Sequence, residues 1–127
     1  MIVNDPAVVA EVRTAFERYE KALVGNDIPV LDELFWEADE TVRFGAFEEL
    51  FGRDEIRAFR QARPARGLDR TLRRTEIVTF DDTFAVVSTT FTREGVPGVG
   101  RQSQAWVRLP EGWRVVGAHV SQRKPVD

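Results

Sequence analysis

The sequence contains no cysteine and only one histidine, and it lacks the familiar catalytic motifs. Without cysteine the chain can form no disulfide bond, no zinc site built on thiolates and no thiol nucleophile. A single histidine makes a histidine-rich metal site unexpected. A glycine-rich phosphate loop, a GxSxG nucleophile elbow and an HExxH sequence are also missing. We therefore expect any chemistry here to proceed without a metal and without a cofactor.

Long apolar runs and a strong charge of one sign are absent as well. No stretch approaches the roughly 20 apolar residues that a membrane-spanning helix needs, and the first residues lack the pattern of a signal peptide. The formal net charge is −3, from 18 Lys and Arg against 21 Asp and Glu, which is too small and too mixed to indicate nucleic-acid binding. We expect no membrane and no nucleic-acid partner, and a cytoplasmic location, which the lack of cysteine also fits.

What the sequence does have is a local concentration of arginine in its middle. The members are Arg57, Arg60, Arg63, Arg66, Arg70, Arg73 and Arg74. One interpretation is a set of solvated side chains on a helix end and a loop. The other is that one or two of them turn inward to hold an anionic ligand.

The N-terminal half shows helical signals. Asn4, Asp5 and Pro6 are typical of a helix start, and apolar residues then recur at spacings of three and four up to Leu23. Gly25 predicts the helix end. A short second helix is expected over residues 27–35, and a third over residues 52–62.

From about residue 69 the pattern alternates with a period of two, which indicates strands. After a short strand at residues 41–44 and its return at 47–51, we expect strands at 72–80, 84–93, 101–109 and 113–122, joined by tight turns. Long strands twist and curl. The sequence thus predicts one α+β domain over residues 1–127, in which N-terminal helices pack on a strongly curved, antiparallel or mixed sheet. This element order resembles the cone-shaped cystatin-like, or nuclear-transport-factor-2-like, fold.

Two residues stand out as candidates for a pocket. Tyr19 is the only tyrosine and lies on the apolar stripe of the first helix; it is either a core residue or a hydrogen-bond donor to a ligand. Arg43 lies between Val42 and Phe44, so strand alternation places it on the opposite face from both. It is either a surface residue paired with an acid or a pocket residue that binds a carboxylate.

The last strands add further polar candidates. Alternation sends Arg101 to one face and Gln102 to the other, and polar groups on a covered face need partners. His119 shares a face with Trp113 and Val115 by the same alternation. It is either a hydrogen-bonded core residue or a donor and proton carrier in the pocket.

Several sequence blocks together resemble the AtzH-like family, which includes the oxalurate-catabolism protein HpxZ. They lie at residues 4–6, 19–23, 34–36, 42–45, 52–56, 101–107 and 112–121. The resemblance covers nearly the whole chain and implies the cone fold. For one branch it implies decarboxylation of 1,3-dicarboxyurea to allophanate without metal or cofactor; the other branch is tied to oxalurate breakdown.

The resemblance also implies roles for individual residues. It places Tyr19 and Arg43 in the pocket as the catalytic pair, Arg43 holding a carboxylate and Tyr19 donating a proton or hydrogen bond. Dry walls and contacts to the far end of a small anionic substrate are expected from Phe16, Trp106, Arg63, Arg101, Gln102 and His119.

Two other functions are also consistent with this sequence. One is a non-catalytic protein that captures a ureido acid or assists a neighbouring amidohydrolase. The other is a purely structural dimer domain whose interior is filled by its own side chains. In each case a homodimer through the sheet is expected, because the strand face away from the helices is too apolar to remain wet.

Overall fold

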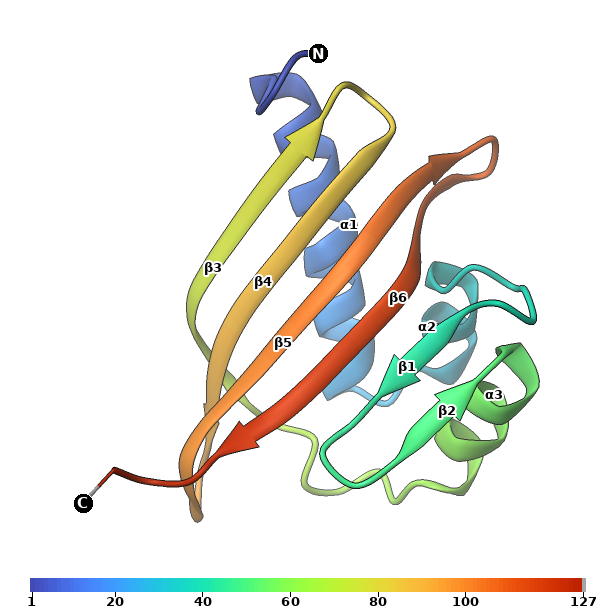
Figure 1. Ribbon diagram of the computed structural model, residues 1–127. Coiled ribbons are helices and arrows are strands. Elements are labelled where there is room, and N and C mark those ends of the chain that lie inside the picture. Colours follow the sequence, from blue (N-terminus) through green and yellow to red (C-terminus); the bar gives the residue numbers. More distant parts are fainter. Residues whose placement is uncertain (127) are drawn as a thin grey trace.

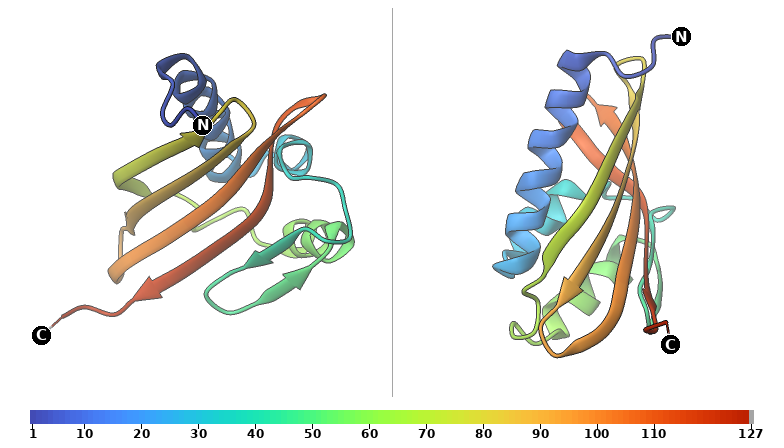
Figure 2. Two further views of the ribbon diagram at one scale, coloured as in Figure 1. Left: turned by 45° about the horizontal axis from the view of Figure 1, so that its top comes forward. Right: turned by 90° about the vertical axis from the view of Figure 1, so that its left-hand side faces the viewer.

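The computed structural model describes residues 1–126, so Asp127, the last residue of the predicted domain, lies outside the described residues. Three helices lie on one side of a sheet (Figures 1 and 2). They are α1 (Pro6–Val24), α2 (Ile28–Leu34) and α3 (Arg53–Ala62). The strands are β1 (Val42–Phe44), β2 (Glu49–Phe51), β3 (Thr71–Phe80), β4 (Phe84–Arg93), β5 (Val96–Leu109) and β6 (Gly112–Arg123).

Helix α1 forms where the sequence predicts it, and for the predicted reasons. The Asp5 side chain accepts a hydrogen bond from the backbone N–H of Ala7, and Pro6 occupies the first turn. One stripe of α1 is buried against the sheet, and Gly25 ends the helix. The members of this stripe are Val8, Val12, Phe16, Tyr19, Ala22 and Leu23. Burial of this stripe fixes which way Tyr19 points.

The sheet has six strands in the order β2-β1-β6-β5-β4-β3. Within residues 1–126, β1 pairs with β6 in parallel, and the other neighbouring strands of the sheet pair antiparallel. The long strands bend around α1, while the short β1–β2 hairpin extends the sheet beneath α2 and α3 (Figure 2). The predicted α+β architecture, with helices covering a curved mixed sheet, is confirmed.

The core lies between α1, α2 and the concave face of the sheet. Val12, Leu31, Trp106 and Val115 have no exposed surface at all. Full burial of a large apolar side chain contributes about 1.5–3 kcal/mol, so these residues hold the helices onto the sheet. Among the described residues no helix is both long and apolar enough to cross a membrane.

The structure differs from the sequence prediction at two places in the sheet, one turn and one β-bulge. β5 begins at Val96 instead of residue 101, because Gly95 adopts a φ of 77°, which permits a tighter reversal than the predicted four-residue turn. In β6, Val115 pairs with Trp106 and Gly117 with Ala105, so Val116 is an extra residue in a β-bulge. The bulge reverses the inside–outside alternation for the rest of β6.

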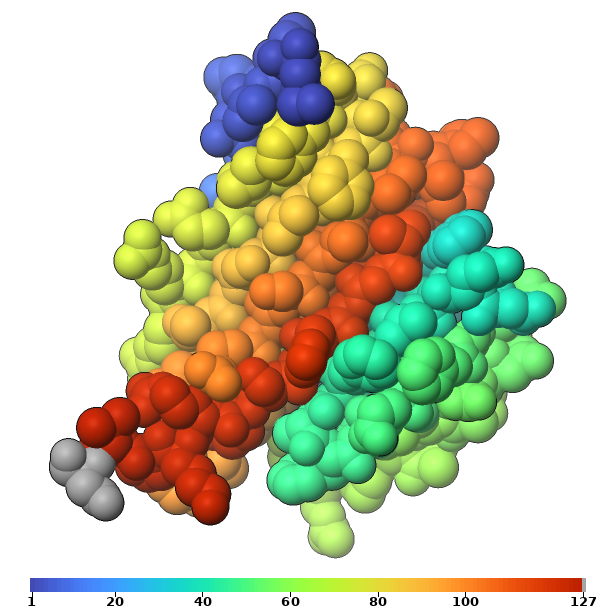
Figure 3. All heavy atoms as spheres, in the orientation of Figure 1, coloured from blue at the N-terminus to red at the C-terminus, as the bar shows by residue number. Residues whose placement is uncertain are grey.

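The convex face of the sheet carries no helix (Figure 3). A shallow cleft there is lined by residues of four strands, among them Val42, Phe44, Val86, Ser103, Ala105 and His119. Phe51 on the edge strand β2 is 56% exposed. This face is therefore both open and partly apolar.

Candidate functional site

Tyr19 lies on the buried stripe of α1, between the helices and the concave face of the sheet. Its side chain is 2% exposed, and its ring centroid lies 6.1 Å from that of Phe35. The hydroxyl forms no side-chain hydrogen bond within residues 1–126, yet it is not among the polar atoms that are sealed from solvent without a partner. The phenol is thus buried, with a hydroxyl that is still able to meet a ligand.

Arg43 turns inward from β1, as strand alternation predicts. It is 8% exposed, and its guanidinium lies 5.3 Å from the centroid of the Phe59 ring of α3. Its Nη1 donates to Glu48 Oε1 at 3.0 Å. The Glu48 carboxylate lies against Gly45, where an added Cβ would come within 1.7 Å of Glu48 Oε1. Glycine at position 45 therefore gives the carboxylate room to reach Arg43.

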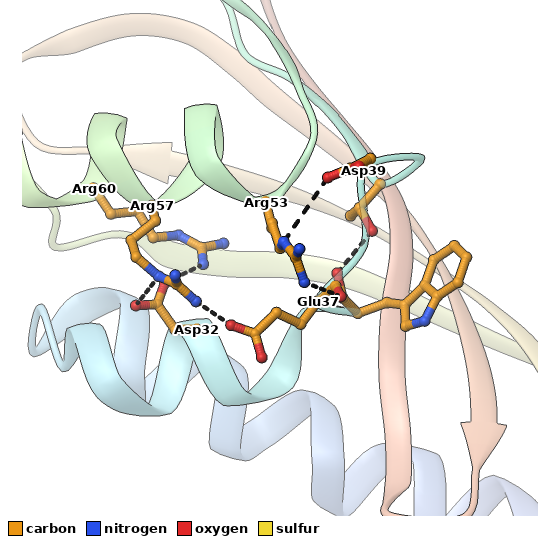
Figure 4. Close-up of polar contacts among 8 residues, drawn as sticks. Asp32, Glu37, Asp39, Arg53, Arg57 and Arg60 are labelled. Atoms are coloured by element: carbon orange, nitrogen blue, oxygen red, sulfur yellow. Dashed lines mark hydrogen bonds and ion pairs between the residues drawn. The ribbon is translucent and has the colours of Figure 1, made fainter.

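Arg60 enters the same interior from α3. It is 2% exposed and lies 4.2 Å from the centroid of the Phe35 ring, in cation–π geometry. Its Nη1 contacts Asp32 Oδ1 at 3.4 Å, and Asp32 also pairs with Arg57 (Figure 4). Arg57 in turn pairs with Glu37, so a chain of ion pairs fastens α3 to α2. A narrow cleft between these helices has Arg60 in its wall.

Arg63 and Arg93 also face the interior, but they have no carboxylate partner within residues 1–126. Arg63 follows the end of α3 and lies 5.9 Å from the centroid of Phe59; Arg93 ends β4 and lies 5.0 Å from that of Phe91. Within residues 1–126 neither guanidinium has an acidic partner within 4.0 Å. Arg63 Nε and Nη2 and Arg93 Nε are sealed from solvent without any hydrogen-bond partner.

Arg70 is the most firmly held arginine of the interior. Its Nε and Nη2 donate to the two carboxylate oxygens of Glu20 at 2.8 and 2.6 Å, a bidentate pair. The same Nη2 donates to Gln102 Oε1 at 3.1 Å. The guanidinium lies 4.4 Å from the centroid of Phe91. Arg70 thereby links α1 to β4 and β5.

We call these five inward arginines the arginine cluster: Arg43, Arg60, Arg63, Arg70 and Arg93. Within residues 1–126 they face three carboxylates, those of Glu48, Asp32 and Glu20, which leaves an excess of two positive charges. Elements distant in the sequence supply them: β1, α3, the segment after α3 and the end of β4. A buried cationic surplus of this kind favours an anion.

Burial and mutual repulsion lower the pKa of three arginines of the cluster. Burial lowers the pKa of Arg60 to about 10, with the cations of Arg43 and Arg63 acting in the same direction and Tyr19 opposing them. Burial, followed by Arg43, lowers the pKa of Arg63. Burial, followed by Arg70, lowers the pKa of Arg93. An arginine side chain keeps its proton in a protein, so the mutual repulsion of these guanidiniums persists until an anion joins them.

Several residues predicted for the pocket do lie in this interior. Phe16 on α1 is 3% exposed, and Trp106 and Gln102 on β5 are 0% and 2% exposed. Arg63 lies there too, beside Phe59. Their positions agree with the prediction, while their roles remain to be tested.

Two predictions for the pocket are wrong. His119 lies exposed on the convex face, where its ring is edge-on to Phe44 at 5.6 Å between centroids. The bulge at Val116 accounts for this, because it moves His119 to the face opposite Val115. Arg101 is exposed on the same convex face, where its Nε donates to Ser121 Oγ. Neither shares a site with Tyr19.

Sequence analysis missed Arg93 altogether. It ends a strand just before a turn, a place typical of solvated arginines, so no local signal marks it. Arg60 and Arg70 belonged to the noted arginine-rich stretch, but nothing there distinguished them from exposed Arg66 or Arg74. Within the described residues, no three acidic or histidine side chains are grouped to hold a metal ion.

Comparisons with known proteins identify the family and the fold of the chain. A family model described as AtzH-like matches residues 1–125. A solved protein of unknown function from Pectobacterium atrosepticum, of the DUF3225 family, is 60% identical over 96% of this chain and 95% of that one, with a TM-score of 0.94. A cystatin-like fold protein from Burkholderia xenovorans is 46% identical over 100% and 99% of the two chains, with a TM-score of 0.94.

More distant structures share the fold alone. An NTF2-like protein of unknown function from Pseudomonas putida is 20% identical over 97% of this chain and 96% of that one, with a TM-score of 0.77. The fold is thus cystatin-like, or NTF2-like, as expected. No curated protein matches the chain at a significant level.

Proposed function

Because the chain belongs to the AtzH-like family, we propose that it decarboxylates a small ureido acid such as 1,3-dicarboxyurea, without metal or cofactor. The observation that carries the proposal is that both catalytic candidates lie in the interior between the helices and the sheet. Tyr19 and Arg43 are 2% and 8% exposed. Tyr19 and Arg60 both lie beside the Phe35 ring, and Arg43 and Arg63 both lie beside the Phe59 ring. A phenol and a guanidinium thus border the same small, cationic interior.

The reaction requires a carboxylate held in place and a proton for the departing nitrogen. Arg43 holds the N-carboxylate, which supplies orientation and charge. As the bond between carbon and nitrogen breaks, its electron pair passes to the urea nitrogen, CO2 leaves, and the Tyr19 hydroxyl gives its proton to that nitrogen. Water then returns a proton to the phenolate. The surrounding guanidiniums stabilise the transient phenolate charge, more strongly here than in water.

The test is turnover of freshly prepared 1,3-dicarboxyurea, followed as CO2 release above the spontaneous rate. Tyr19→Phe removes only the hydroxyl, and loss of proton donation is expected to lower kcat by about 10²–10⁴-fold. Arg43→Lys retains the charge but loses the planar fork, so a raised KM is expected. Arg74→Lys is the matched control, because Arg74 is 81% exposed. Full activity in both interior variants would reject the assigned roles.

A second candidate function is capture of a ureido acid, such as oxalurate, without catalysis, for example as an accessory protein in oxalurate or purine catabolism. The placement of His119 outside the site favours it, since this leaves the interior without a histidine to move protons. The same arginines would bind the acid, and Tyr19 would need to donate only a hydrogen bond. Thermal stabilisation by oxalurate with no product from any ureido acid would support capture.

We also propose that two copies pair through the convex face of the sheet. Support comes from its open, partly apolar surface around Val42, Phe44 and Ala105. Burying such a surface is favourable at about 25 cal/mol per Å². The pairing leaves the arginine cluster untouched, because that cluster lies on the other side of the sheet.

A further inference from the structure

The interior contains polar atoms that have no partner, and those beside the arginine cluster are all hydrogen-bond donors. They are Arg63 Nε and Nη2, Arg93 Nε, Gln102 Nε2 and Gln104 Nε2, each sealed from solvent within residues 1–126. The two unpartnered oxygens belong elsewhere, to Asn26 in the turn after α1 and to Thr79 beside Asn4. Gln102 and Gln104 are 2% and 1% exposed.

The orientation of both glutamine amides follows from their neighbours. Gln102 Oε1 accepts from Arg70, and Gln104 Oε1 accepts from Trp106 Nε1 at 3.2 Å. Arginine and tryptophan offer donors only. Turning either amide around would set donor against donor, so the NH2 groups must be the free ends. The bidentate bond from Glu20 fixes Arg70 and thereby fixes Gln102.

Three of these side chains are close together. Arg70, which holds Gln102, shares the Phe91 ring with Arg93. After burial, the charges of Arg70 and Arg63 lower the pKa of Arg93, so Arg63 lies in the same region. Gln104 pairs with Val87, far along β4 from Arg93, and stands apart from the other three.

We propose that Arg63, Arg93 and Gln102, the donor set, bind a second carboxylate of the ligand, so that the site selects dicarboxylates over monocarboxylates. The inference rests on the proposed function, in which Arg43 binds the first carboxylate. A carboxylate brings two acceptor oxygens and no donor, which matches the donor set and its uncompensated charge. A terminal amide would direct N–H groups at other N–H groups and would be rejected.

Binding of glutarate and glutaramate to the full chain, measured by titration calorimetry, tests this selection. Glutarate has two carboxylates separated by the same number of chain atoms as in 1,3-dicarboxyurea, and it has no carbon–nitrogen bond to break. Glutaramate replaces one carboxylate by an amide. We expect glutarate to bind at least about 10-fold more tightly, the effect of one charge-assisted hydrogen bond. Equal affinities would overturn the inference.

Variants then identify the residues responsible. Arg63→Gln and Arg93→Gln should each reduce the preference for glutarate towards unity, whereas Arg74→Gln should preserve it. Gln102→Glu keeps the oxygen that faces Arg70 but replaces the free N–H donor by an acceptor, so it should abolish the preference for glutarate. Gln61→Glu, on the exposed side of α3, is the control for the added negative charge. A preference that survives all three interior substitutions, in variants that circular dichroism shows to be folded, would also overturn the inference.

The outcomes separate this inference from the proposed function. Selective glutarate binding that depends on Arg63 and Arg93, with no decarboxylation, would support the donor set and reject the enzyme. Decarboxylation without a preference for glutarate would support the enzyme and reject the donor set.

Discussion

Removing one charge from the Glu20–Arg70 pair should destabilise the fold far more than removing one from an exposed pair of the same kind. In Glu20→Gln the side chain keeps its shape but loses its charge. The Arg70 side chain is 1% exposed and that of Glu20 15%, so the remaining guanidinium would be buried without a counter-charge. Breaking a buried pair in this way costs about 3–5 kcal/mol.

The chain offers a matched control. Arg18 and Glu33 form the same two-pronged contact between α1 and α2, but their side chains are 46% and 47% exposed. Exposed pairs contribute about 0–1 kcal/mol, because water and salt screen them. Glu33→Gln should therefore lower the free energy of unfolding by at most about 1 kcal/mol.

Urea denaturation followed by circular dichroism measures both variants on one scale. With a slope of about 1.5 kcal/mol per M for a small protein, Glu20→Gln should lower the midpoint by about 2–3 M and Glu33→Gln by less than about 0.7 M. Equal shifts would refute the reasoning, since they would mean that Arg70 is as well solvated as Arg18.

Other substitutions test separate parts of the fold. Gly100→Ala should lower the free energy of unfolding by about 1–3 kcal/mol, because the new Cβ would lie 2.2 Å from the Phe91 ring. Gly117→Ala, with nothing within 4 Å, should change it by less than about 1 kcal/mol. Thermal melts compare the two variants. Asp5→Ala removes the α1 cap and should cost about 1 kcal/mol, read as a lower urea midpoint. Phe44→Glu, on the convex face, should convert a dimer to a monomer in light scattering; a wild-type monomer at working concentrations would contradict the proposed pairing.

Much of the fold could be predicted because local patterns are strong here. The capped, amphipathic stretch of α1 and the long alternating strands each have one stable solution, and helices placed before a meander must cover one face of the sheet. The inward direction of Arg43 also follows from alternation in β1. These inferences use neighbours in the sequence only.

The site could be predicted only in part, because it depends on features that local patterns do not record. A single extra residue at Val116 sends His119 outward, and no residue type marks the bulge. Arg93 joins the arginine cluster because the sheet curves around Phe91, which brings the end of β4 close to the segment after α3. Such placements come from the curvature of the whole sheet.

The close approach of Glu48 to Gly45 couples stability to charge at this position. In Gly45→Ala the new methyl group would meet the flexible end of Glu48, and the carboxylate would swing away. Arg43, whose side chain is 10% exposed, would then lose its counter-charge, which destabilises a buried guanidinium. A mutational screen that scores folding would therefore record this position as sensitive, although no apolar contact is lost.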